Sequence, residues 1–182
     1  TRQFKLKRQA EDFRSQTHIE VKQKTHAIRS NTTISDAAEN WIREAEGDDL
    51  ENSTIEQYRQ HVTLHINPII GLEKLEQLSV PFVREFRRKL RSGISHELAN
   101  NYVDGLIEKR RTSPSPRQRD RMIASVAGPR SLAMVRKILV SLGSIIADAQ
   151  EDGLINRNPV RELRKGRRNQ QERRQKKELM PG

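Results

Sequence analysis

The sequence predicts an all-α protein organised as a four-helix bundle. Apolar residues recur at spacings of three and four along most of the chain, as they do on the buried side of an amphipathic helix. Ser and Thr residues that favour helix starts, and Gly and Pro residues that favour helix ends, separate these stretches, and no strand-like alternation stands out. The expected core helices cover residues 34–46, 52–66, 79–92 and 129–152, with an extra helix inserted before the last.

The first core helix, residues 34–46, follows a group of potential N-caps that includes Thr33 and Asp36. Trp41 anchors its apolar side, and Gly47 ends it. The other side is acidic, so we expect this helix to point away from a nucleic acid.

The second core helix, residues 52–66, should start at Asn52 or Ser53 and form a capping box with Glu56. Because the residue before a proline rarely stays helical, Pro68 should end it. Its buried side carries the apolar residues Ile55, Tyr58, Val62 and Ile66. Off that side lie the polar residues Ser53, Thr54, Gln57 and His61.

A turn should follow, and its aliphatic side chains should fill the core: Ile69, Ile70, Leu72, Leu75 and Leu78. Ser79 caps the third core helix, Pro81 stands just inside it, where the missing N–H has no cost, and Gly93 ends it. One side of this helix is apolar, and the other is basic: Arg84, Arg87, Arg88, Lys89 and Arg91.

An insertion at about residues 94–128 separates the third core helix from the last. Residues 94–113 have the periodicity of a helix, and two Ser-Pro pairs then break it. Residues 117–128 have a mixed pattern that predicts no more than a short turn.

The last core helix, residues 129–152, carries the longest apolar stripe and should lie at the centre of the bundle. Gly153 suits its C-cap, and Asn158-Pro159-Val160 should end the folded part.

Three parts are therefore expected along the chain. Residues 1–31 form a basic N-terminal helix and linker, residues 32–162 a helical domain, and residues 163–182 a basic linker or tail. Within the first part, residues 5–24 predict an amphipathic helix whose basic residues surround one apolar side. That side carries Leu6, Ala10, Phe13, Thr17 and Val21.

Composition narrows the class of protein. The sequence has no cysteine, which excludes disulfides, thiolate nucleophiles and Cys-bound zinc. No apolar run is long enough for a membrane span and no signal-peptide pattern opens the sequence, so we expect a cytoplasmic protein without a membrane partner.

The net charge of +11 is unevenly distributed. Residues 1–30 hold eight basic and three acidic side chains and residues 161–182 hold nine and three, whereas residues 33–66 hold two and eight. Basic segments at both ends of the sequence, with the acidic residues 33–66 between them, favour a polyanionic partner such as nucleic acid. Basic tails also serve simply to keep proteins soluble.

Patterns typical of catalysis are not evident. We find no Gly-rich phosphate loop, Gly-x-Ser-x-Gly motif or paired-carboxylate motif, and we expect no cofactor. His61 and His65 stand four apart on one helix, as two metal ligands would, but no Glu or Cys lies at a useful offset. Surface or partly buried histidines are the favoured interpretation.

Two helix starts carry small polar and basic side chains that suit DNA binding. These are Ser53, Thr54 and Gln57 on the second core helix, and Arg130, Ser131, Met134 and Lys137 on the last. Such groups contact phosphates and, in a major groove, base edges. A plain capping role explains Ser53 and Thr54 equally well.

The chain resembles the core-binding domain of the tyrosine recombinases of the phage integrase type. The matching motifs are Thr54-x3-Tyr58, His65-Ile-Asn-Pro-x-Ile-Gly71, Leu75-x2-Leu78-Ser79 and a longer one that runs from Leu139 through Gly153-Leu-Ile to Asn158-Pro159-Val160. Their order spans about residues 33–162. The preceding basic helix is similar to the end of an arm-type DNA-binding region.

The resemblance implies a SAM-like helical domain that clamps duplex DNA at the recombination core site, with the second and fourth core helices near the major groove. The residues it places near DNA are Ser53, Thr54, Gln57, Arg130, Ser131, Met134, Lys137 and Ser141. We add four basic residues of the tail: Arg164, Lys165, Arg167 and Arg168. Self-association on DNA, within a full-length recombinase, would follow from the same resemblance.

Catalysis in this family needs a tyrosine nucleophile with arginines, a lysine and histidines in a downstream domain, which we expect this chain to lack. Its tyrosines, Tyr58 and Tyr102, fall in helices of the binding domain, and His26-Ala-Ile-Arg29 spells a family motif in the wrong domain. We therefore expect a non-enzymatic portion of a protein of DNA integration and recombination, associated with the nucleoid.

Two alternatives remain at this point. One is a helical protein-interaction module that docks through residues 5–24 and the insertion. The other is an RNA-binding helical domain, against which the shortage of aromatic residues for base stacking argues.

Overall fold

Helices form the regular structure of residues 31–48 and 50–163, the part of the chain that the computed structural model describes. Their bounds are α2 Ile34–Gly47, α3 Asn52–His61, a π-helical turn Val62–Ile66, α4 Asn67–Ile70, a 3-10 turn Leu75–Gln77, α5 Val80–Ser92, α6 His96–Arg110, α7 Pro116–Ala127 and α8 Leu132–Glu151. These residues contain an isolated bridge between Thr33 and Lys74 but no strand. The predicted all-α class is confirmed.

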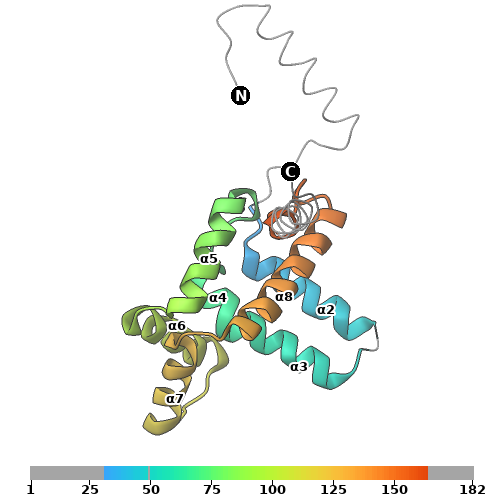
Figure 1. Ribbon diagram of the computed structural model, residues 1–182. Helices are drawn as coiled ribbons and strands as arrows, with labels where there is room; N and C mark the ends of the chain where they lie inside the picture. Colours follow the sequence, from blue (N-terminus) through green and yellow to red (C-terminus); the bar gives the residue numbers. More distant parts are fainter. Residues whose placement is uncertain (1–30, 49, 164–182) are drawn as a thin grey trace, which may run out of the picture.

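The arrangement places α8 in the middle of the bundle (Figure 1). α2 and α3 pack on one side of it and α5 on the other. α6 and α7 pack on each other near the start of α8. Among the described helices, none is both long and apolar enough to cross a membrane.

The main core combines buried side chains from α2, α4, α5 and α8. Ile138, Leu142 and Ile145 of α8 are fully buried there, together with Phe86 of α5 and Ile34 of α2. Burial of each such side chain contributes roughly 1.5–3 kcal/mol. The helix with the longest apolar stripe therefore takes the central position, as predicted.

Hydroxyl side chains begin most of these helices. At α2, Thr33 N–H donates to the Asp36 carboxylate at 3.0 Å, and Asp36 N–H donates to Thr33 Oγ1 at 3.1 Å, which completes a capping box. Serine hydroxyls accept the N–H of the residue three positions on at Ser79, Ser95, Ser115 and Ser131. These caps explain why the starts of α2 and α5 could be predicted closely.

The start of α3 differs from the predicted capping box. Glu51 is the N-cap, and no side chain caps the helix. Ser53 already lies inside α3, so its hydroxyl donates to Glu51 Oε2 at 3.3 Å instead of accepting a backbone N–H of the first turn.

The second core helix also continues past its predicted end. The chain stays helical through the π-helical turn into α4, which ends at Ile70. In the turn, Asn67 N–H donates to the carbonyl of Val62, five residues back. This wider turn gives the ring of Pro68 room that an α-helical turn would deny it.

The insertion contains two helices rather than one helix and a short turn. A capping box of Ser115 and Gln118 begins α7. Between α6 and α7 lies a second, smaller core of Ala99, Val103, Ile123, Val126 and Ala127. The buried stripe of α7 is narrow, which is why its sequence has a weak helical period.

The two ends of the insertion lie side by side. Ile94 N–H donates to Ala127 O at 3.0 Å, and Arg130 N–H donates to Leu90 O at 2.8 Å. Gly93 has a φ of +81°, and a Cβ there would lie 2.5 Å from the Ala127 carbonyl oxygen. Only glycine permits this approach without strain.

Leu72 does not fill the core, contrary to prediction, because 91% of its surface is exposed. The turn that carries it is held against the start of α2, where Ser35 N–H donates to Gly71 O and Ile34 N–H donates to Glu73 O, both at 2.9 Å. With the backbone fixed on that side, the leucine side chain points outward. Leu75, three residues on, is fully buried as expected.

After α8 the chain folds back over it. Gly153 has a φ of +74° directly after the C-cap, in agreement with its predicted role. Asn158 Nδ2 donates to Gly143 O at 2.8 Å, and Val160 is buried. Residues 159–163 are helical, so the folded chain continues past Asn158-Pro159-Val160. The predicted helix at residues 5–24 and the tail from 164 lie outside the described residues.

Candidate nucleic-acid interface

The exposed side of α8 combines two basic residues with aliphatic ones. Helical spacing places Ala133, Arg136, Lys137 and Val140 on this side, and all four are exposed. Val140 keeps 49% of its surface exposed. Aliphatic side chains beside cations suit a major groove, where a lysine donates to guanine and methyl groups contact thymine.

α3 borders this side of α8. His61 Nδ1 lies 2.8 Å from Ser141 Oγ of α8, and the nearby charge of Lys137 adds to the larger effect of burial in lowering the pKa of His61. Residues three, four or seven apart share one side of a helix, so Thr54 and Gln57 lie on the side of α3 that His61 occupies. We call Thr54, Gln57, Ala133, Lys137 and Val140 the α3–α8 surface.

The prediction that Ser141 faces DNA is wrong. Its exposure is 4%, as is that of His61, which the sequence had placed off the buried side. The two side chains share a hydrogen bond where α3 and α8 cross. Polar groups that satisfy each other can be buried at such a crossing, and neither pattern nor spacing reveals the pairing.

Arg130 is also engaged within the fold. Its Nε donates to His65 Nδ1 at 2.9 Å, and its other nitrogens donate to the carbonyls of Ser125, Val126 and Gly128 around the end of α7. The half-buried guanidinium thus links α7 to the π-helical turn. Most of its donors are therefore engaged within the fold, and its role as a DNA contact stays a prediction.

Burial, with the charge of Arg130 as the next cause, lowers the pKa of His65 to about 4. The imidazole is therefore neutral at pH 7, as an acceptor for Arg130 must be. The Nδ1 atoms of His65 and His61 are thus both occupied by protein groups. Within residues 31–48 and 50–163, no group of three or more His, Asp or Glu side chains is arranged to hold a metal ion.

The start of α3 is less suited to a phosphate than the sequence predicts. Glu51 places a carboxylate at the positive end of the helix and engages the hydroxyl of Ser53. Gln57, almost two turns further along, is exposed, and Thr54 is half-buried. Base contacts by Thr54 and Gln57 fit this surface better than phosphate contacts by Ser53.

At the start of α8, Ser131 is exposed and Met134 is half-buried against the core. Ser131 Oγ accepts the N–H of Met134 at 3.2 Å, so it serves as the N-cap. Its hydroxyl hydrogen is still available for an outside acceptor.

α5 adds a basic side that the sequence-based selection of site residues omitted. Four arginines and a serine line a shallow depression of about 490 Å³: Arg84, Arg87, Arg88, Arg91 and Ser92. The spacing of three and four was visible in the sequence, and the missing information was that α5 packs beside α8.

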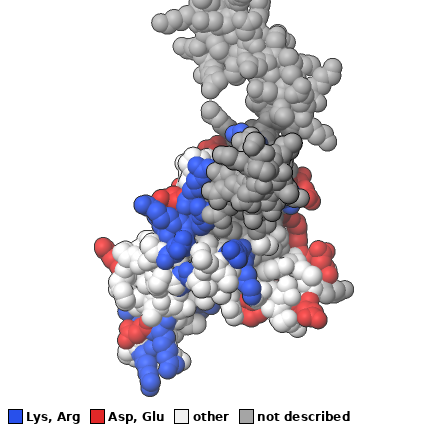
Figure 2. Space-filling model, viewed as in Figure 1, with Lys and Arg blue, Asp and Glu red and all other residues white. Residues whose placement is uncertain are grey.

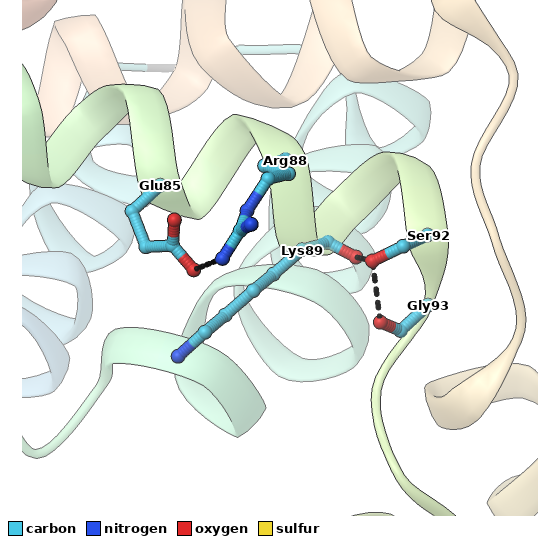
Figure 3. A network of polar contacts seen from close by, with 5 residues as sticks. All are labelled: Glu85, Arg88, Lys89, Ser92 and Gly93. Atoms are coloured by element: carbon cyan, nitrogen blue, oxygen red, sulfur yellow. Dashed lines mark hydrogen bonds and ion pairs between the residues drawn. The ribbon is translucent and has the colours of Figure 1, made fainter.

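The end of α5 is held by short-range polar contacts (Figure 3). Glu85 accepts from Arg88 at 2.7 Å, and Ser92 Oγ donates to the carbonyl oxygens of Lys89 and Gly93. Lys89 extends away from these contacts in the same view. One carboxylate therefore balances only part of the positive charge of this helix.

Figure 2 shows how the charges are distributed over this face. Lys and Arg gather over α5, recur on α8 and appear again at the lower end of α7, whereas Asp and Glu concentrate at the edge formed by α2 and α3. Such a separation directs a polyanion to the α5–α8 side. Four further predicted contacts lie outside the described residues: Arg164, Lys165, Arg167 and Arg168.

Residues 33–91 match the family model described as phage integrase, N-terminal SAM-like domain. This segment is therefore similar to the phage integrase SAM-like family. It comprises α2 to α5, about one third of the 182-residue chain. The match confirms the predicted resemblance, and it supports a tyrosine recombinase core-binding domain with a recombinase-related role in DNA binding. Searches of curated proteins and of solved structures found no match.

Proposed function

We propose that this chain is the DNA-binding portion of a phage-type site-specific integrase and that it holds duplex DNA against the α3–α8 surface and α5. The observation that carries this proposal is the exposed side of α8, which presents Lys137 and Val140 on the helix that lies between α3 and α5 (Figure 1). The SAM-like segment supports it from the family side.

In this arrangement α8 enters the major groove. A helix with its side chains is about 10–12 Å wide, and the groove is about 12 Å wide. Lys137 would donate to a guanine edge, Val140 would contact a thymine methyl group, and Gln57 has the geometry to bind adenine in a bidentate manner.

The arginines of α5 would contact phosphates. Arg84 and Arg91 are seven residues apart, which corresponds to about 10 Å along the helix, close to the rise of three base pairs. Both belong to α5, over which Lys and Arg gather in Figure 2. Phosphate contacts of this kind set the register of the protein on DNA without reading sequence.

Strand cleavage would be the task of another domain. Tyr102 OH donates to Thr63 O at 2.7 Å, and burial raises the pKa of this phenol to about 12. The ring of Tyr58 packs on Trp41 with 4.4 Å between centroids. Both tyrosines thus have structural roles, which supports a non-catalytic binding function for this chain.

Fluorescence anisotropy with a labelled mixed-sequence duplex tests the proposal. Binding should be tight at low salt and should weaken linearly in a double-logarithmic plot against salt, with a slope of about −0.9 per phosphate contact. Replacement of Arg84 and Arg91 by alanine should make this slope shallower by about 1–2. Absence of binding at low salt would refute the proposal.

The double variant Thr54→Ala with Lys137→Ala tests the base contacts proposed for the α3–α8 surface. Each lost base contact weakens binding to a preferred sequence by about 1–3 kcal/mol, whereas helicity and melting temperature should stay nearly unchanged. Arg43→Ala, on the exposed side of α2, removes one charge at the acidic edge and is the matched control. Competition by single-stranded RNA that equals competition by duplex DNA would favour the RNA-binding alternative.

A further inference from the structure

A groove of about 680 Å³ lies between α4 and α6, beside the start of α2. Its apolar lining comprises Pro68, Leu72, Leu98, Tyr102 and Leu106. Leu72 and Leu98 are 91% and 43% exposed. Two leucines exposed at the rim of one groove mark it as an interaction surface rather than as part of the core.

The groove is preformed and open. Hydrogen bonds from α2 fix the turn that presents Leu72, as described above, so this leucine has a defined position. Gly105 of α6 also lines the groove, and no atom lies within 4 Å of the place where its Cβ would be. The space above Gly105 is therefore available to an apolar side chain from outside.

The chain enters the described structure next to this groove. Asn31 Oδ1 accepts from Lys74 Nζ at 2.9 Å, and Leu75 N–H donates to Thr32 O at 3.1 Å. Thr33 forms the bridge to Lys74, two residues after Leu72. Whatever precedes residue 31 is thus tethered directly beside the exposed leucine.

The sequence that precedes this point has an apolar side of its own. Residues 5–24 predict an amphipathic helix with Leu6, Phe13 and Val21 on that side. Residues 25–30 can span on the order of 20 Å when extended, which is enough to return the helix to the groove. Arg110 lines the groove beside Lys109, which pairs with Glu39 at 3.5 Å, and Glu11 and Asp12 directly precede Phe13.

We propose that residues 5–24 of this chain dock through their apolar side into the groove between α4 and α6, with Phe13 between Leu72 and Leu98. The tether raises the effective concentration of the segment to the millimolar range, which favours docking within one chain over docking between two at ordinary dilution. Docking in this place does not depend on DNA binding, since the groove involves neither the exposed side of α8 nor α5.

The absence of native cysteines allows a direct test by disulfide formation in the full chain. The variant Thr17→Cys with Asn101→Cys pairs the apolar side of the segment with the groove lining. Mild oxidation should give an intramolecular disulfide, seen as a monomer of altered mobility on a non-reducing gel and confirmed by peptide mass spectrometry. Ser15→Cys with Asn101→Cys is the matched control, because Ser15 lies on the opposite side of the predicted helix, and it should cross-link at least several-fold more slowly.

Gly105→Phe provides the second test, because it places a bulky side chain in the groove and no atom lies within 4 Å of its Cβ position. In the Thr17→Cys with Asn101→Cys background it should slow cross-linking several-fold, while circular dichroism and the melting temperature show that the bundle is intact. Equal cross-linking rates for Thr17→Cys and Ser15→Cys, or no effect of Gly105→Phe, would overturn the proposal. A product that is mainly a cross-linked dimer, with a yield that rises with protein concentration, would overturn it in favour of a second copy as occupant.

Discussion

The two apolar cores of this molecule differ in the size and origin of their side chains. The main core contains Phe86 and many leucines and isoleucines, contributed by helices that are distant in sequence. The second core has two alanines among its five buried members, and all five come from the neighbouring helices α6 and α7. Hydrophobic stabilisation scales with buried apolar area, so α6 and α7 gain much less from their own core than the bundle does.

Polar contacts with the bundle compensate for the small second core. Tyr102 of α6 donates to the carbonyl of Thr63, and Arg130 joins the end of α7 to His65. The comparison teaches that apolar packing holds the bundle together, whereas a few directional bonds and the packing of Leu64 on the second core attach the insertion to it. Each of the following changes tests that difference.

Truncation of a core side chain should have the largest effect, and it should differ between the cores. Leu142→Ala should lower the free energy of unfolding by about 2–5 kcal/mol, because it leaves a cavity in the main core. Val103→Ala in the second core removes fewer atoms and should cost about 1–2 kcal/mol. Urea denaturation followed by the fluorescence of Trp41 measures the free energy of unfolding of each variant. Equal shifts of the unfolding midpoint would contradict the difference between the two cores.

Removal of the Arg130 link should separate the insertion from the bundle. Arg130→Met keeps much of the side-chain volume but leaves His65 and the carbonyls of α7 without donors, at a cost of about 1–3 kcal/mol. Hydrogen exchange should accelerate in α7 and the π-helical turn more than in α2. The control Arg136→Met, on the exposed side of α8, should change stability by less than about 0.5 kcal/mol.

The buried His65 should make stability depend on pH. Its pKa of about 4 in the fold lies below the value of about 6.5 in an unfolded chain, so the unfolded state binds more protons between these values. The contribution of the neutral imidazole to the free energy of unfolding is complete above about pH 6.5 and is lost as the pH falls toward 4. This loss should be roughly 1–2 kcal/mol after allowance for solvent screening. Urea midpoints at several pH values measure this loss, and His65→Gln, which keeps an acceptor for Arg130, should flatten the profile.

A helix cap should have the smallest effect and the most local one. Ser115→Ala removes the capping box of α7 and should cost about 1 kcal/mol, visible as faster hydrogen exchange in α7. Ser79→Ala removes the matching cap of α5, but there the cost should appear as a lower midpoint of global unfolding. If both variants shift the global midpoint equally, the insertion unfolds together with the bundle.

The local signals in the sequence predict the bundle well, because capping residues and apolar periodicity act over a few residues. Thr33 with Asp36, and Ser79 before Pro81, mark helix starts that the structure reproduces. α7 was missed although Ser115-Pro116-x-Gln118 carries the same kind of cap, since its buried stripe is too narrow to give a clear period.

Contacts between distant segments could not be predicted from such signals. The partners of Ser141 and Arg130 are His61 and His65, both more than sixty residues away along the chain. The π-helical turn before Pro68 likewise depends on how the chain packs, and spacing alone does not reveal it. Gln57 and Lys137 belong to the predicted site and are exposed. Neither forms a buried hydrogen bond of the kind that Ser141 and Arg130 form with the two histidines.

The paired ends of the insertion have a consequence for how this domain can be altered. Because Ile94 bonds to Ala127 and Arg130 to Leu90, the chain leaves and re-enters the bundle at nearly the same point. α6 and α7 are therefore an exchangeable module: a short turn from Gly93 to Pro129 would replace them without rerouting α5 or α8. Another helical hairpin could be grafted at the same junction, so this position offers a site for fusing a sensor or a second binding unit to the bundle.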